Sequence, residues 1–145
     1  MPSLSNHDPF RAVATVTVDA SPGDVYDTLT DVATLKTLFD AARIKMEVRP
    51  EQPYFLETWR DGRARPHYGR ILVLQRPTLV ELTWVDEATG GQESIVTIDL
   101  EPRGKKTSVV VTHSGFVDEA ARALHEGLWQ EMVNQLPRYL KKAAA

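Results

Sequence analysis

The sequence predicts one α+β domain in which an antiparallel sheet of about seven strands curves around a long C-terminal helix. Three observations predict this arrangement. Two short helical segments follow the first strand, and residues 43–114 then read as consecutive short strands with turns between them. The chain ends in one long amphipathic pattern over about residues 118–142. A sheet and a helix that each have one apolar face can bury those faces against each other.

The beginning of the domain is marked by alternation and by a helix start. Residues 11–20 alternate apolar and polar side chains, which is typical of a half-buried strand. Ser21 is suited to cap the following helix, and Pro22 is suited to its first position. Residues 33–40 then predict a second short helix, with Phe39 facing inward.

The later strands differ in how clearly their inward face can be identified. A strand over residues 43–49 is expected to end at Pro50. Residues 54–59 and 67–75 also read as strands, but their apolar runs do not show which face is inward. The next strands alternate cleanly, and residues 85–93 read as a hairpin loop between two of them. The inward residues predicted for these strands are Val80, Leu82, Trp84, Val96, Ile98, Leu100, Val109, Val111 and His113.

The last helix has an apolar stripe with a histidine in its middle. At 100° per residue, His125 falls within the arc formed by Leu128, Trp129 and Met132. Pro137 should kink this helix or weaken its last turn, because proline removes a backbone donor and clashes with the preceding turn.

Composition limits the classes of function. The 145 residues carry a net charge of −3 and have no strong basic patch, so a nucleic-acid partner is disfavoured. The absence of cysteine excludes disulfides and thiolate chemistry. Residues 1–10 lack the pattern of a signal peptide and no stretch is long enough for a membrane span, so we expect a flexible lead-in, a single domain over residues 11–145 and a cytoplasmic location.

The inward polar residues are the candidates for a binding site. His113 and His125 could face one volume between the last strand and the helix, and an imidazole there could orient a ligand or carry a proton. Both rings could equally be packed and satisfied by neighbouring groups. Two histidines without a third ligand at a fixed spacing do not predict a metal site, and we expect none. The candidate ligand-binding residues are His113, His125, Trp84, Trp129, Met132, Leu82, Val111 and Leu128.

Several motifs resemble one protein family over about residues 12–142. The most specific are "PTLVELTW" and "THSGF", in the order expected relative to "SPGDVYDTLTD" and to "HEGLW" on the last helix. These segments resemble the family similar to the C-terminal domain of the activator of Hsp90 ATPase, within the START-like, Bet v 1-like (SRPBCC) superfamily. The resemblance implies a helix-grip fold, in which a cavity can lie between the sheet and the helix.

Three classes of function follow from these observations. The first is binding of a small, largely apolar molecule in that cavity. The second is an enzyme of the polyketide cyclase or hydrolase type found in the superfamily, with a pocket histidine as general acid or base. The third is a protein-interaction module, either co-chaperone-like or a partner of a regulator. No nucleophile motif or phosphate-binding loop is found, so we assign no catalytic residue, expect no cofactor and favour binding over catalysis. A homodimer would be compatible with any of the three.

Overall fold

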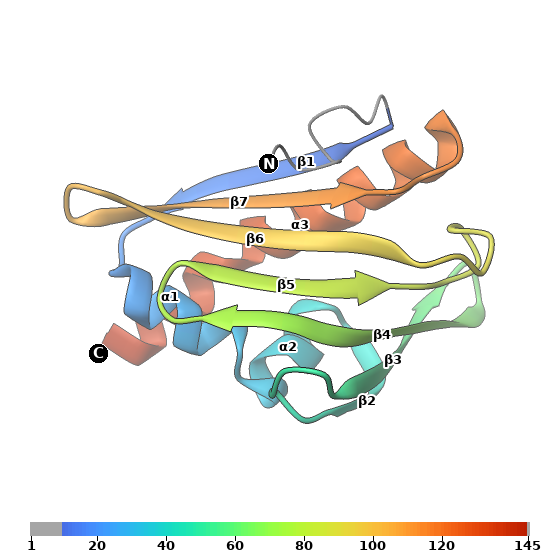
Figure 1. Ribbon diagram of the computed structural model, residues 1–145. Coiled ribbons are helices and arrows are strands. Elements are labelled where there is room, and N and C mark those ends of the chain that lie inside the picture. Colours follow the sequence, from blue (N-terminus) through green and yellow to red (C-terminus); the bar gives the residue numbers. More distant parts are fainter. Residues whose placement is uncertain (1–9, 145) are drawn as a thin grey trace.

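A seven-stranded antiparallel sheet holds a long helix against one face in the computed structural model of the protein, which describes residues 10–144 (Figure 1). The strand order is β1-β7-β6-β5-β4-β3-β2, so the first strand closes against the last and the others form a meander. The predicted α+β class, the two short helices and the long C-terminal helix are confirmed. The elements are β1 (Ala12–Val18), α1 (Pro22–Leu29), α2 (Val32–Leu38), β2 (Ala41–Met46), β3 (Pro53–Arg60), β4 (Arg63–Gln75), β5 (Leu79–Trp84), β6 (Ser94–Arg103), β7 (Lys106–Ser114) and α3 (Glu119–Ala144).

Each helix begins at a side-chain cap. The Ser21 hydroxyl accepts a hydrogen bond from the Asp24 backbone N–H at 3.2 Å, and Asp31 caps α2 in the same way. Asp118 accepts from the Ala121 N–H at 2.8 Å at the start of α3. Helix α3 then continues through Pro137.

Helix α3 also covers the free edge of the sheet at β1. The Glu126 carboxylate accepts from the Val13 N–H at 3.0 Å. The Gln130 amide accepts from the Thr15 N–H and donates to the Thr15 carbonyl. These contacts fix the helix along β1 and leave its buried face toward the concave side of the sheet.

The structure settles the two strands whose inward face was ambiguous. In β3, Tyr54 and Leu56 are buried. In β4, the pairing with β5 shifts between Ile71 and Val73, so a bulge lets both Ile71 and Leu74 reach the interior. The bulge breaks the period of two, which explains why alternation could not give the phase.

Strand β2 is shorter than predicted. It ends at Met46, whereas the alternation suggested a strand to Arg49. The Arg49 N–H donates to the Glu47 carbonyl at 2.9 Å, so the chain turns here, and Glu51 then adopts a left-handed φ of 71°. This local turn ends the strand before Pro50.

The ends of the chain are described only in part. Residues 1–9 of the predicted lead-in lie outside the described residues. Phe10, which we expected in that lead-in, is partly buried and packs against Ala12, Phe116 and Ala121. Among the described residues, no helix is long and apolar enough to cross a membrane.

Candidate functional site

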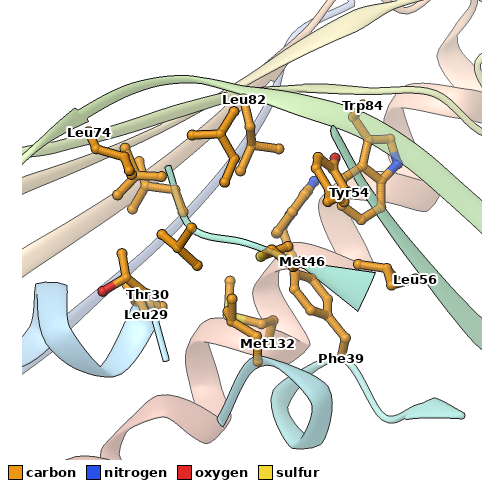
Figure 2. Close-up of a pocket in the computed structure, with 16 residues that line it drawn as sticks. Leu29, Thr30, Phe39, Met46, Tyr54, Leu56, Leu74, Leu82, Trp84 and Met132 are labelled. Carbon is orange, nitrogen blue, oxygen red and sulfur yellow. The ribbon is translucent and has the colours of Figure 1, made fainter. Parts of the chain in front are cut away.

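The space between the sheet and α3 is largely filled by side chains. An apolar cavity of about 40 Å³ remains beneath β3–β6 (Figure 2). Its walls are aliphatic and aromatic, including Leu29, Met46, Leu82 and Met132. A volume of this size could hold at most a few water molecules, and apolar cavities of this kind stay dry. It is therefore part of the packed core, and too small for a drug-sized ligand.

A larger cleft opens beside this cavity, between the end of α2, the end of β3 and the middle of α3. Its volume is about 400 Å³, within the range of small-molecule sites. Phe39, Trp84 and Trp129 line both spaces, and their rings pack against one another with centroids 5.1 to 5.9 Å apart. This aromatic cluster lies between the cavity and the cleft. Other cleft-lining residues include Thr58, Trp59, Arg60, His67, His125, Leu128 and Met132.

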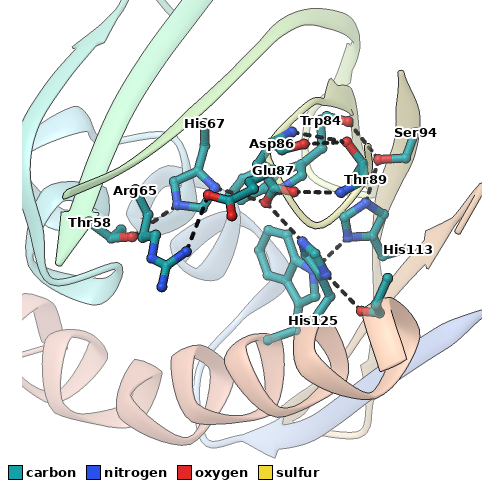
Figure 3. A network of polar contacts seen from close by, with 12 residues as sticks. Thr58, Arg65, His67, Trp84, Asp86, Glu87, Thr89, Ser94, His113 and His125 are labelled. Atoms are coloured by element: carbon teal, nitrogen blue, oxygen red, sulfur yellow. Dashed lines mark hydrogen bonds and ion pairs between the residues drawn. The ribbon is translucent and has the colours of Figure 1, made fainter. Parts of the chain in front are cut away.

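A buried carboxylate lies at the centre of the polar network behind the cleft (Figure 3). Asp86 Oδ2 accepts from Trp84 Nε1 at 2.8 Å and contacts ring nitrogens of His67 at 3.0 Å and His125 at 2.9 Å. Its Oδ1 accepts from the Thr89 N–H at 3.0 Å. Burial alone would raise the pKa of Asp86, but the hydrogen bonds from His125, His67 and Trp84 outweigh burial and hold the pKa well below its usual range. Asp86 is thus a buried carboxylate ion.

The partners of His125 determine where its hydrogens lie. Its Nδ1 is 2.8 Å from the Ala121 carbonyl, which can only accept, so Nδ1 carries a hydrogen. Its Nε2 faces the ionised Asp86, so this nitrogen also carries one. His125 and Asp86 therefore form a buried imidazolium–carboxylate pair, with both ring nitrogens occupied.

His67 has the opposite arrangement at its second nitrogen. A neutral ring with its hydrogen on Nδ1 donates to Asp86, and Nε2 is then an acceptor. Thr58 Oγ1 lies 2.9 Å from Nε2, and in this tautomer the hydroxyl donates to the ring. We call this hydroxyl–imidazole–carboxylate series, Thr58 to His67 to Asp86, the Thr58 chain. His67 is almost completely buried, whereas Thr58 is half-buried and faces the cleft.

His113 belongs to a second series, which we call the Ser94 chain. Trp129 Nε1 donates to His113 Nδ1 at 2.9 Å, so the neutral ring carries its hydrogen on Nε2. Nε2 donates to Ser94 Oγ at 2.7 Å, and the Ser94 hydroxyl donates to the Trp84 carbonyl at 2.6 Å. Each hydrogen-bonding group of His113 is therefore used within the protein.

The surroundings of His113 favour its neutral form. Burial lowers the pKa of His113 well below its usual value, and the nearby charge of His125 lowers it further, against a smaller opposing effect of Asp86. The side chain is 0% exposed. His113 is thus held neutral inside the core.

The structure brings some of the candidate ligand-binding residues together and separates others. The His113 and His125 rings do lie side by side, with centroids 5.0 Å apart. His125 and Leu128 line the cleft, and Leu82 lines only the small apolar cavity. His113 and Val111 line neither. Trp84, Trp129 and Met132 line both.

Sequence reasoning missed the polar residues at the centre of the site. The sequence places Asp86 in a hairpin loop and does not resolve the phase of His67. A signal for Asp86 does exist, because it continues the alternation of Val80, Leu82 and Trp84 on the inward face. Among residues 10–144, no group of three or more His, Cys, Asp or Glu side chains could hold a metal ion.

The fold and these residues can be compared with known proteins. Residues 19–141 match the model of the Activator of Hsp90 ATPase homolog 1-like protein family. The chain belongs to this family. No curated protein matches it.

Solved structures with this family's helix-grip fold are similar at low sequence identity. A protein from Chromobacterium violaceum is 19% identical with a TM-score of 0.76, over 91% of this chain and 97% of the other. An Hsp90 activator from Plasmodium falciparum is 15% identical with a TM-score of 0.73, over 90% and 96%. DynU16, from the dynemicin biosynthetic locus, is 17% identical with a TM-score of 0.75, over 92% of this chain and 48% of its own. These likenesses show the shared fold.

Proposed function

We propose that the protein binds a small, largely apolar molecule in the cleft between α2, β3 and α3. The observation that carries this proposal is the cleft itself, whose volume of about 400 Å³ is about ten times that of the apolar cavity. Small-molecule sites are concave and mostly apolar, with a few polar groups that set orientation. Half of the residues that line this cleft are apolar or aromatic, and the other half are polar or charged.

The two sides of the cleft indicate how a ligand would lie. Phe39, Leu128, Trp129 and Met132 supply an apolar wall from α2 and α3. Thr58 and its neighbours on β3 and β4 supply polar groups on the opposite side. A flat or elongated apolar molecule with one polar end would place its body on the aromatic wall and its polar end toward β3.

This proposal changes the roles expected of the two histidines. His125 borders the cleft, but its nitrogens are bonded to Ala121 and Asp86. His113 lies behind Trp129. We therefore propose that the ligand contacts the Trp129 and His125 rings by packing, while His113 supports Trp129 from the core.

Two of the structural relatives differ in the role that their names give. DynU16 is a putative protein in the dynemicin biosynthetic locus, and the Plasmodium falciparum protein is an Hsp90 activator. The cleft favours the small-molecule role for this chain, because a concave site of this size encloses a ligand and does not present a flat surface to a protein.

Native mass spectrometry of the protein as purified, followed by titration with a panel of lipids, polyketides and aromatic compounds, tests this proposal. We expect the larger side chain in Leu128→Trp to fill the cleft and to weaken binding of a panel ligand at least about tenfold. A tenfold change in affinity corresponds to about 1.4 kcal/mol of binding free energy. Leu124→Trp is the matched control, because Leu124 lies one turn earlier on α3, is also half-buried and lines neither space. Equal binding by both variants, or no binding by the parent protein, would refute the proposal.

A further inference from the structure

We infer that the Thr58 chain is a nucleophile–base–acid triad that hydrolyses small carboxylic esters bound in the cleft. The inference rests on the proposed function, because the ester would occupy the same site. Thr58 would be the nucleophile, His67 the general base, and Asp86 the group that positions His67.

The geometry of the chain meets the requirements of a triad. An activated nucleophile needs a base within hydrogen-bond reach, and a third group must orient that base. Thr58 Oγ1 is 2.9 Å from His67 Nε2, and His67 Nδ1 is 3.0 Å from Asp86 Oδ2. The hydrogen on Nδ1 leaves the lone pair of Nε2 directed at the Thr58 hydroxyl. The proton can therefore pass from the hydroxyl to the ring.

The sheet and its loop hold these three groups in place. In the pairing of β3 with β4, Leu56 lies opposite His67 and Thr58 lies two residues further on the same face, so the two side chains are diagonal neighbours. Asp86 is fixed on the other side by the hydrogen bonds of its backbone and Oδ1 with Thr89. In Figure 3, His67 lies between Thr58 and Asp86.

The surroundings of Thr58 define the class of substrate. Arg60 lies two residues along β3, lines the same cleft and has no ion-pair partner among the described residues. Its guanidinium is a candidate donor to the oxyanion that forms on an attacked carbonyl. Asp40 and Glu131 also line the cleft and would repel a carboxylate product. A neutral ester with a short aliphatic or aromatic acyl group fits both the charges and the volume.

The reaction balances with water as the only co-reactant. Thr58 Oγ1 attacks the ester carbonyl while its proton moves to His67 Nε2, which gives a tetrahedral intermediate. The C–O bond to the alcohol breaks, and the alcohol leaves with the proton from His67. Water then attacks the acyl-threonine ester with His67 again as base, which releases the acid and restores the Thr58 hydroxyl.

Hydrolysis of 4-nitrophenyl butyrate by the full chain tests the inference. We expect Thr58→Val, which keeps the shape and lacks the hydroxyl, to lower kcat/KM at least about 100-fold, the lower range for loss of a catalytic proton-transfer group. Thr58→Ser should retain activity. Thr97→Val is the matched control, because Thr97 is also half-buried on a strand and lies outside the cleft. In acid-quenched parent protein, peptide mapping should place a butyryl group on Thr58.

A second measurement separates this inference from the binding proposal. Titration with N-(4-nitrophenyl)butanamide, the amide analogue of the ester, reports binding without turnover. One contrary result is that the amide binds while the parent and Thr58→Val hydrolyse the ester equally, and another is that the amide binds while butyryl groups are found only on lysines. Either result would overturn the triad and leave the binding proposal intact. If the amide does not bind and the ester is not hydrolysed, the triad is overturned, and the ligand panel decides the binding proposal on its own.

Discussion

The Ser94 chain and the Thr58 chain are built from the same kinds of group but run in opposite directions. Each joins a hydroxyl to an imidazole. In the Ser94 chain the ring receives a hydrogen bond from Trp129 and donates to the hydroxyl. In the Thr58 chain the ring donates to Asp86 and receives from the hydroxyl. The group beyond the ring, an indole N–H or a carboxylate, therefore decides which way the hydrogens point.

This difference separates a structural histidine from one suited to proton transfer. His113 has no lone pair available to a ligand, because Trp129 uses it. His67 directs its lone pair at a hydroxyl that faces the cleft. Burial alone does not distinguish the two, since both rings are nearly inaccessible to solvent. The identity and direction of the hydrogen-bond partners distinguish them.

The largest loss of stability is expected from substitution of Asp86, the buried charge at the end of the Thr58 chain. In Asp86→Asn, an amide nitrogen replaces one carboxylate oxygen and leaves buried donors without an acceptor and the His125 charge without a counterion. Breaking a buried ion pair costs about 3–5 kcal/mol. Urea unfolding should show this loss in the free energy of unfolding.

Glu87→Gln is the control for that experiment. Glu87 adjoins Asp86 in sequence, but its ion pair with Arg63 is exposed, and such pairs contribute about 0–1 kcal/mol. A loss in Asp86→Asn no larger than in Glu87→Gln would show that the buried pair contributes nothing special to stability.

Removing each hydroxyl compares the two chains directly. Ser94→Ala leaves the buried Nε2–H of His113 without an acceptor, which should cost about 1–3 kcal/mol. Thr58→Val removes a hydroxyl that is half-buried at the edge of the cleft, whereas Ser94 is fully buried, so this substitution should cost less than about 1 kcal/mol. Chemical denaturation of both variants checks the order. A larger loss in Thr58→Val would contradict the assigned hydrogen-bond directions.

The last comparison concerns pH and the neutral state of His113. Its pKa is lowered on folding, so below its ordinary value of 6.5 the unfolded chain binds a proton that the folded protein does not. The contribution of neutral His113 to the free energy of unfolding is present above pH 6.5. It is lost as the pH falls below this value, by about 1.4 kcal/mol per pH unit.

His113→Gln, which cannot titrate, isolates this effect. Between pH 7.5 and 5.5, the parent protein should lose about 1.4 kcal/mol more unfolding free energy than the variant, since one pKa unit corresponds to this amount. Urea titrations of both proteins at the two pH values provide the measurement. Parallel losses in the two proteins would mean that His113 is not held neutral.

The sequence was sufficient for the fold because the relevant signals are local. Val96, Ile98 and Leu100 alternate as predicted and are all buried, and Ser21 caps α1 as predicted. The family resemblance predicted that the sheet curves around the long helix. These features depend on neighbouring residues or on a pattern repeated along one strand.

The candidate site could be predicted only in part because its polar residues depend on distant contacts. The residues next to Asp86 in the sequence are typical of a turn. Its burial follows from contacts with His67 and His125, which are 19 and 39 residues away. The bulge near Ile71 hid the phase of β4, and with it the inward direction of His67. The apolar wall, including Trp129 and Met132, was visible as a helical stripe.

The helix contacts along β1 have a consequence for self-association. Because Glu126 and Gln130 already bond to the backbone of Val13 and Thr15, a strand from a second molecule cannot pair at that edge without displacing them. The opposite edge is the six-residue strand β2, which carries the charged Arg43 and Lys45. Short, charged edge strands discourage pairing. Any homodimer of this protein would therefore form through side chains on a face of the molecule, and not by extending the sheet from one copy into the next.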